Sequence, residues 1–217
     1  MALKKLLIIC SFFLVMIQCG CIEILEKITV NADHSGRAEF AIDLGMLGSI
    51  ANSTAGNYLD LSFMDQIKSF PATYESKIKN IAGISNIKAI SDDKNGLYSI
   101  AFDFKNPAAL NRAIYTYFDK AESLFKPRPI KIRRHYFHQR NFAPLIRQYY
   151  KQNQSKIKDE SIFKYVDYVS VFVLPKDVRS ISNTKSMLKR DGKTITFKTS
   201  LNDLLTTDIN VGNRINY

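Results

Sequence analysis

The sequence predicts an α+β fold in which antiparallel β-hairpins pack with helices, after a separate N-terminal segment. Two observations predict this class. Apolar and polar residues alternate in paired stretches on either side of short turn sequences, and other stretches repeat apolar residues at helical spacing. The chain of 217 residues, 46% of them apolar, is long enough to bury one large core or two small ones.

The first half of the chain contains two predicted β-hairpins. The alternation that begins at Ile22 is interrupted by the turn sequence Asp33-His34-Ser35-Gly36 and resumes at Ala38. A second turn sequence, Asp92-Asp93-Lys94-Asn95-Gly96, separates two further alternating stretches. The predicted strand pairs are 22–32 with 38–44, and 84–91 with 97–104.

Helices are predicted between these hairpins. Residues 59–70 and 74–81 have helical spacing, with Pro71 expected at the junction of two helices and Gly83 as a C-terminal cap. The tract 45–57 is small and polar, which predicts a loop.

A further helix is predicted over 107–125, where Asn106 supplies an N-cap and Pro107 occupies the first helical position. The elements predicted near the C-terminus are a strand over 165–174, a strand pair of 186–190 with 193–199 across Asp191-Gly192, a short helix over 201–206 and a last strand over 208–215.

The first twenty residues have the three parts of an export signal. Lys4 and Lys5 form a basic start, an uncharged apolar run extends from Leu6 to Ile17, and the small residue Gly20 follows. A transmembrane helix needs about 20 apolar residues, so this run is too short to span a bilayer. We therefore expect a signal peptide over 1–20 and a single mature α+β domain over 21–217.

Two cysteines at the end of this segment are candidate lipid attachment points. In bacterial lipoproteins the signal ends in a small residue directly before the cysteine that receives acyl chains, and Gly20-Cys21 supplies that junction. Cys19 is the alternative acceptor, because Gln18 stands three positions before Cys21, where an aliphatic residue is usual. Two or three acyl chains anchor a protein stably, since each buried methylene contributes about 0.8 kcal/mol. The other interpretations are an uncleaved anchor and an ordinary secretory signal.

The positive charge of the mature part is concentrated in one segment. Without residues 1–20 the chain has 29 basic and 20 acidic residues, a net charge of +9. Residues 126–158 contain ten Lys or Arg and no Asp or Glu, so the remainder is close to neutral. The candidate anion-binding or partner-binding residues are Arg128, Lys131, Arg133, Arg134, Arg140 and Arg147. The alternative is a solvated, partly helical face whose aromatic residues pack inward.

The class of partner expected for the basic segment depends on whether the protein is exported. Aromatic residues among the cations, such as Tyr136 and Tyr149, would indicate nucleic acid in a cytoplasmic protein, but no nucleic acid is expected for an exported one. The anions available outside the cytoplasm attract a polybasic surface by about 1 kcal/mol for each Lys or Arg near a membrane. We therefore expect membrane attachment through the lipid anchor, and binding of anionic lipid, lipopolysaccharide or an envelope protein.

Several short motifs resemble a known group of proteins. They are Gly20-Cys21-Ile22-Glu23-Ile24, Asn31-Ala32-Asp33-His34-Ser35-Gly36, Phe40-Ala41-Ile42-Asp43-Leu44, Gly83-Ile84-Ser85-Asn86-Ile87, Phe102-Asp103-Phe104, Val171-Phe172-Val173-Leu174-Pro175 and Asp191-Gly192-Lys193-Thr194-Ile195-Thr196-Phe197. Together they resemble small uncharacterised lipoproteins of Bacteroidota and, more distantly, LppM-type lipoproteins of actinobacteria. The resemblance leaves residues 126–158 unmatched. It implies a lipid-anchored envelope domain, in the outer membrane, and carries over no catalytic residue.

The sequence contains few patterns that indicate catalysis. His135 and His138 have a spacing that suits two metal ligands on one helical face, but no acid follows His138 within twenty residues and the segment carries ten cations. Nucleophile-elbow and phosphate-loop glycine patterns are absent from the sequence. We therefore expect a non-catalytic binding or interaction module without metal or cofactor. The alternatives are a small envelope hydrolase or metal-dependent enzyme that uses His135 and His138, and a purely structural assembly subunit.

Overall fold

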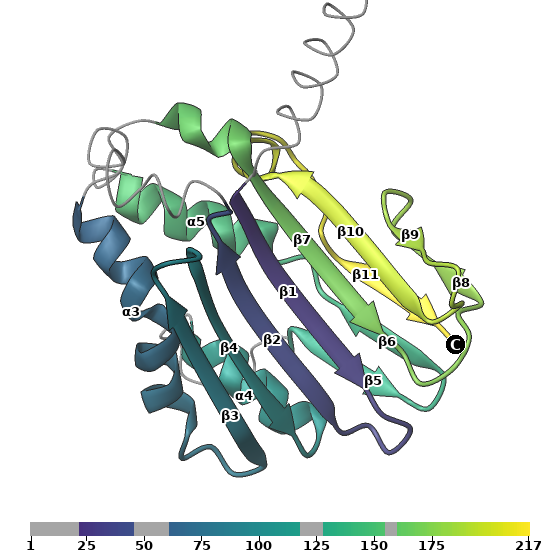
Figure 1. Ribbon diagram of the computed structural model, residues 1–217. Coiled ribbons are helices and arrows are strands. Elements are labelled where there is room, and N and C mark those ends of the chain that lie inside the picture. The colour runs from purple at the N-terminus through teal and green to yellow at the C-terminus, as the bar shows by residue number, and fades with distance from the viewer. Residues whose placement is uncertain (1–21, 46–60, 118–127, 155–159) are drawn as a thin grey trace, which may run out of the picture.

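Two β-sheets and four α-helices in the described residues confirm the predicted α+β class (Figure 1). The computed structural model describes residues 22–45, 61–117, 128–154 and 160–217. Four predicted features lie outside these residues: the signal peptide with Cys19, the lipid attachment at Cys21, almost all of the loop 45–57 and the end of the helix 107–125. Among the described helices, none is both long and apolar enough to cross a bilayer.

The larger sheet has seven strands in the order β3-β4-β2-β1-β7-β10-β9. They are β1 (Ile22–Val30), β2 (Gly36–Asp43), β3 (Ile84–Asp92), β4 (Leu97–Phe104), β7 (Val166–Val173), β9 (Met187–Leu188) and β10 (Thr194–Ser200). The three hairpins expected from the sequence are confirmed, although β9 is only two residues long. β1 and β7 run parallel to each other, and all other neighbours in this sheet are antiparallel.

A second, four-stranded sheet lies behind the first in the order β5-β6-β11-β8 (Figure 1). Its strands are β5 (Ile130–Arg133), β6 (Tyr136–Gln139), β8 (Ser180–Ile181) and β11 (Asn213–Asn216). The basic segment therefore contributes a β-hairpin that the sequence analysis did not predict. The last strand is shorter than the predicted 208–215 and begins later, at Asn213.

The helices are α3 (Leu61–Ile78), α4 (Pro107–Tyr117), α5 (Ala143–Asn153) and α6 (Leu201–Thr206), with a 3₁₀ helix η3 (Glu160–Tyr165). The predicted break at Pro71 is wrong, because α3 continues through it. Its buried side chains form one unbroken stripe at helical spacing: Met64, Ile67, Pro71, Tyr74 and Ile78. Packing of this stripe on the sheet offsets the backbone hydrogen bond that proline removes.

The start of α4 and the end of α3 test two predictions about helix caps. The Asn106 side-chain oxygen accepts a 3.0 Å hydrogen bond from the Ala109 amide, which confirms the predicted N-cap of α4. Gly83 is not the expected cap of α3, because that helix ends at Ile78. Instead Gly83 has a φ of +88° in the turn that leads into β3, a conformation that favours glycine.

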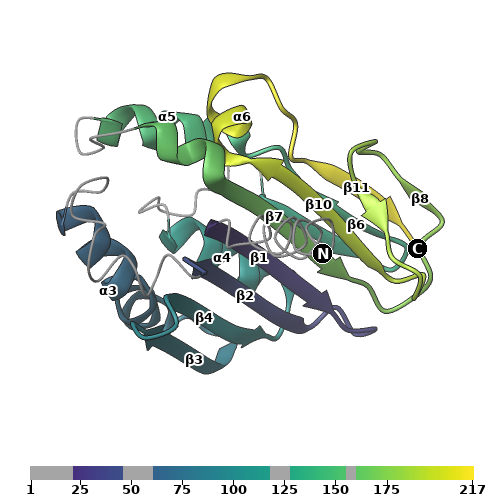
Figure 2. The ribbon, with the colours of Figure 1, turned by 45° about the horizontal axis from the view of Figure 1, so that its top comes forward.

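The core lies between the seven-stranded sheet on one side and α3, α4 and the four-stranded sheet on the other. Side chains from both sheets are at most 1% exposed there, among them Ile28, Ile100, Phe102, Phe137, Phe172, Ile195 and Ile215. Helices α5 and α6 pack at the end of this sandwich where β1 begins, a region that Figure 2 turns toward the viewer. Burial of each large apolar side chain stabilises the fold by about 1.5–3 kcal/mol.

Candidate anion-binding face

The described part of the basic segment forms β5, β6 and α5. In β5 the apolar residues Ile130 and Ile132 point into the core, while Lys131 and Arg133 alternate with them and are exposed. Strand β6 follows the same period, with Phe137 completely buried. The alternation therefore aims the charged side chains away from the core.

The strand register places these outward side chains in two rows. His138 lies opposite Lys131 on one side and opposite Arg214 of β11 on the other. In the second row, Tyr136 lies between Arg133 and Asn216. We call this outward surface of β5, β6 and β11 the basic face; its residues are Lys131, Arg133, Tyr136, His138, Arg214 and Asn216.

Arg214 was not among the residues predicted from the sequence, because it lies far from the basic segment along the chain. Its guanidinium carbon sits 4.9 Å from the centre of the Tyr136 ring, a cation–π distance. Antiparallel pairing of β11 with β6 brings it to the basic face. Arg214 and Asn216 alternate with the apolar Ile215 and Tyr217, and this is the sequence signal that marks the outward direction of Arg214.

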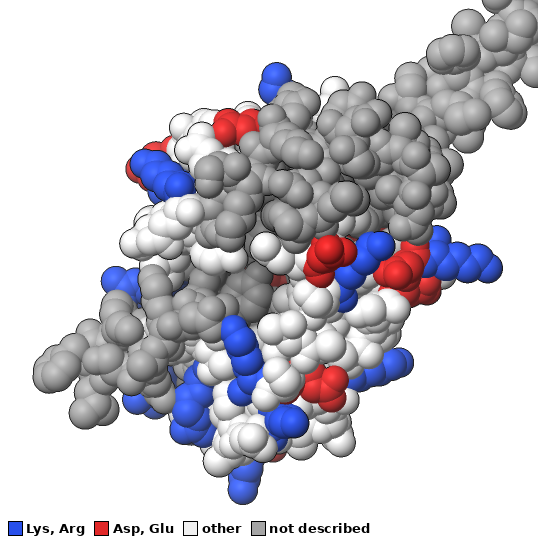
Figure 3. All heavy atoms as spheres, turned by 90° about the vertical axis from the view of Figure 1, so that its left-hand side faces the viewer, with Lys and Arg blue, Asp and Glu red and all other residues white. Residues whose placement is uncertain are grey.

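Positive charge dominates the electrostatics of the basic face. Partial burial, and then the charges of Lys131, Arg214 and Arg140, lower the pKa of His138 from its usual value. None of the four strands in this sheet contains Asp or Glu. The side of the molecule that carries α3 differs, because its described surface shows Asp and Glu as well as Lys and Arg (Figure 3).

The other predicted cations of the segment lie around this face. Arg128 precedes β5, Arg134 belongs to the turn between β5 and β6, and Arg140 follows β6; all three are exposed. The Arg140 amide donates a 2.8 Å hydrogen bond to the Pro129 carbonyl, which closes the hairpin at that end. Their roles in anion binding stay predictions.

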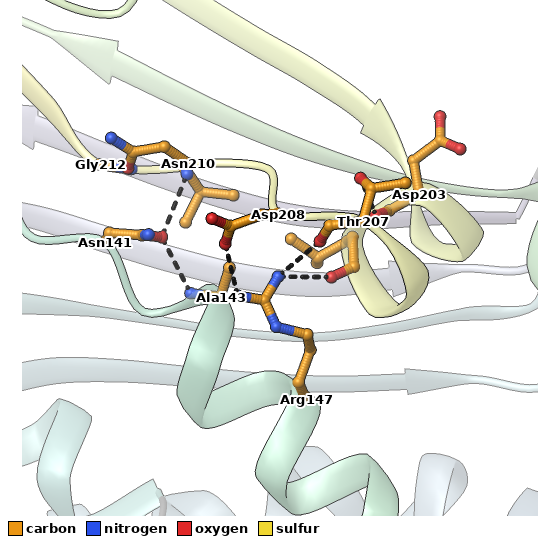
Figure 4. Close-up of polar contacts among 10 residues, drawn as sticks. Asn141, Ala143, Arg147, Asp203, Thr207, Asp208, Asn210 and Gly212 are labelled. Carbon is orange, nitrogen blue, oxygen red and sulfur yellow. Dashed lines mark hydrogen bonds and ion pairs between the residues drawn. The ribbon is translucent and has the colours of Figure 1, made fainter.

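Arg147 lies elsewhere, on α5, where it contacts the end of α6 (Figure 4). Its Nη1 donates hydrogen bonds to the carbonyls of Leu204 (3.2 Å) and Thr207 (2.8 Å), and its Nη2 is 3.3 Å from Asp208. A cation is favourable at a helix C-terminus because the last carbonyls lack backbone partners. The structure thus gives Arg147 a positioning role between two helices, while its predicted role in anion binding stays untested.

Asn141 connects α5 with the chain that enters β11 (Figure 4). Its side-chain oxygen accepts hydrogen bonds of 3.2 Å from the amides of both Ala143 and Val211. Gly212 passes so close that a Cβ there would lie 2.7 Å from the Asn141 nitrogen. This close approach helps to hold β11, and with it Arg214, beside β6.

A buried polar cluster joins the two sheets behind the basic face. Glu26 of β1 points into the core, and its Oε2 accepts hydrogen bonds from Tyr168 (2.7 Å) and from the Gln139 side chain (2.9 Å). The Ser170 hydroxyl donates to the Tyr168 oxygen at 2.9 Å. Burial raises the pKa of Glu26 to about 7, although the hydrogen bonds from Tyr168, Gln139 and Ser170 act to lower it.

This cluster was not predicted from the sequence, although the sequence contains a signal for it. Glu26 occupies an inward position of β1, between Ile24 and Ile28 in the same alternation. A carboxylate at an inward position means either that the strand register is assigned wrongly or that the carboxylate is buried with hydrogen-bond partners. The partners themselves come from β6 and β7, more than one hundred residues away, so no local pattern identifies them.

His135 and His138 do not share a helical face, so that expectation is wrong. His135 lies in the turn after β5, and His138 lies in β6. In the described parts of the chain, no group of three or more His, Cys, Asp or Glu residues is placed to hold a metal ion.

Comparisons with known proteins find a similar solved structure but no matching family. No family model matches the chain, and no curated protein matches it. The NMR structure of the folded domain of the Mycobacterium tuberculosis LppM protein is similar, with 11% sequence identity and a TM-score of 0.43. The match covers 92% of this chain and 90% of that chain.

Proposed function

We propose that the mature chain is a lipid-anchored lipoprotein of the bacterial cell envelope, in the outer membrane, and a non-catalytic module that binds an anionic partner. Cys21 carries the lipid. The partner is an anionic lipid, lipopolysaccharide or an acidic envelope protein, bound through the cations of region 126–158. The observation that carries the proposal is the basic face, on which the outward cations of β5 and β11 lie on either side of β6 without an acid in the sheet.

The start of the fold supports the proposed anchor. β1 begins at Ile22, which is buried in the core beside Met64, Tyr98 and Val166. Because Ile22 directly follows Cys21, a lipid on that cysteine would hold the domain close to the membrane without a flexible linker. Two or three acyl chains would keep it there stably.

The anchor is tested by intact mass and N-terminal peptide analysis of protein purified from its native membrane. We expect a chain that begins at Cys21 and carries a diacyl or triacyl mass. The Cys21→Ser variant is expected to lose that mass and to leave the membrane fraction. An unmodified chain, or acylation that persists in the Cys21→Ser variant, would point to Cys19, plain secretion or an uncleaved anchor.

Anion binding is tested by replacing Arg133, Arg134 and Arg140 with Glu and measuring binding to acidic liposomes and to lipopolysaccharide. Each cation near an anionic surface contributes about 1 kcal/mol, so we expect the triple variant to bind about a hundredfold more weakly. Wild-type binding is expected to weaken as salt is raised, because the cations are exposed.

A matched control carries the same change of net charge outside this region. Lys79, Lys88 and Arg190 are exposed and lie outside region 126–158, so their replacement by Glu is expected to change binding far less. Equal binding of wild type and the Arg133, Arg134 and Arg140 variant would refute the proposed site. Equal losses in both triple variants would mean that only the net charge matters.

A further inference from the structure

The spacing of the basic face suits a ligand with more than one phosphate. Opposite residues on neighbouring strands are about 5 Å apart, so the backbones of Lys131 and Arg214 are separated by about 10 Å, with His138 between them. The second row, with Arg133, follows two residues further along the strand, about 7 Å away. Cations at these separations can contact successive phosphates of a chain.

Arg214 is held in a defined orientation for such a contact. The cation–π contact with Tyr136 at 4.9 Å restrains its guanidinium, whose N–H donors match phosphate oxygens. Asn141 and Gly212 fix the approach of β11 to β6. The contact with Tyr136 therefore favours one placement of the Arg214 guanidinium on the basic face, from which it can donate to a phosphate.

The position of β1 argues against the anchoring bilayer as the ligand. β1 belongs to the seven-stranded sheet, and packed sheets lie about 10 Å apart. The basic face is on the far side of the second sheet, so it lies a full layer away from Ile22 (Figure 1). Cys21 is one residue from Ile22, about 3.8 Å between Cα atoms, which is too short to bring the anchored membrane to that face.

His138 places an ionisable imidazole in the middle of the row, between Lys131 and Arg214. Lys131, Arg214 and Arg140 all disfavour its protonated form. A phosphate chain bound across the row would neutralise these charges and place negative charge beside the ring, so the protonated form would become more favourable. Binding would then take up a proton.

We propose that the row Lys131–His138–Arg214 binds a flexible chain bearing several phosphates that is not part of the anchoring bilayer, with proton uptake at His138. This inference rests on the proposed function and deepens it, since it names the ligand class and adds Arg214 and His138 to the predicted residues. Such a ligand carries several phosphates on a flexible chain and can reach a face that points sideways from the membrane.

The test uses the acylated protein in neutral phosphatidylcholine vesicles and short inorganic polyphosphate as a soluble probe, with affinity measured by calorimetry. We expect wild type to bind, and Arg214→Gln and Lys131→Gln each to bind about fivefold more weakly. Lys88→Gln, which removes an exposed cation from β3, is the matched control and is expected to leave the affinity unchanged.

The outcomes separate this inference from the proposed function. If polyphosphate does not bind while acidic liposomes still bind in a charge-dependent way, the inferred ligand class is wrong and the proposed function stands. If neither binds, the proposed function fails as well. If Arg133→Gln weakens polyphosphate binding but Arg214→Gln does not, the assignment of the binding site to Lys131, His138 and Arg214 is wrong.

Proton uptake is tested on the same probe at two pH values. Wild type is expected to bind roughly threefold to tenfold more tightly at about pH 5 than at about pH 8. His138→Gln is expected to lose this difference, whereas His135→Gln, in the neighbouring turn, is expected to keep it. The NMR titration of the His138 ring should shift to higher pH when polyphosphate is added. If polyphosphate leaves the NMR titration of His138 unchanged, or if His138→Gln still binds more tightly at low pH, the proposed proton uptake at His138 is wrong.

Discussion

Glu26 is the residue whose position departs most from the simple rule of apolar residues inside a sheet sandwich. Its carboxyl is buried with three polar neighbours, Tyr168, Ser170 and Gln139, and none of them carries a positive charge. Within the described part of the chain, the Gln139 Oε1 has no hydrogen-bond partner. A protonated Glu26 would satisfy that oxygen if the amide were turned, so the environment favours the neutral acid.

This environment makes stability depend on pH. The pKa of Glu26 is raised from 4.5 to about 7, so the folded chain binds a proton that the unfolded chain releases between these values. The contribution of Glu26 to the free energy of unfolding is fully present below pH 4.5 and is lost as the pH rises through about 7. Its total is about 3 kcal/mol, at about 1.4 kcal/mol for each pH unit.

Urea unfolding at a series of pH values checks this prediction. We expect the free energy of unfolding of wild type to fall between pH 4.5 and about 7, and the Glu26→Gln variant to lack this fall. Glu23→Gln, on the outward side of the same strand, is the matched control and should keep the wild-type slope. A Glu26→Gln variant with the same slope as wild type would show that another group causes it.

At the scale of elements, the sequence predicts what local patterns encode. The β1–β2 and β3–β4 hairpins, β7, α6 and the cap of α4 follow from alternation, turn residues and a single asparagine. Pro71 shows where a local rule fails. The apolar stripe of α3 continues on both sides of the proline, and its packing on β3 and β4 decides the outcome.

The second sheet shows a different limit. Its strands have only two to four residues, so each carries a weak periodic signal. The sequence contains the alternation of Ile130, Lys131, Ile132 and Arg133. The concentration of positive charge around it, however, predicts an anion-binding or solvated segment and does not by itself indicate strands. The candidate site was therefore predicted in part: Lys131 and Arg133 follow from composition, whereas Arg214 requires the pairing of β11 with β6.

At the scale of the whole molecule, the two sheets share one core. Phe137 of the four-stranded sheet packs on Phe172 of the seven-stranded sheet, with ring centres 4.7 Å apart. The parallel pair of β1 and β7 is equally non-local, because it joins strands more than one hundred residues apart. Local patterns do not encode either contact, which is why the sheet order was not predicted from the sequence.

A shared core predicts cooperative unfolding, and Phe137→Ala tests it. Removal of this fully buried ring is expected to lower the free energy of unfolding by about 3–5 kcal/mol. If the sheets are one unit, far-UV circular dichroism and tyrosine fluorescence should report a single urea transition that shifts as a whole. Leu188→Ala, on the short edge strand β9 where Leu188 is 44% exposed, is the control and should change stability by no more than about 0.5 kcal/mol. Two separate transitions in Phe137→Ala, with the seven-stranded sheet retained after the first, would show that the sheet with the basic face unfolds independently. Arg214 and Lys131 would then lie on a separable element rather than on a surface fixed to the seven-stranded sheet.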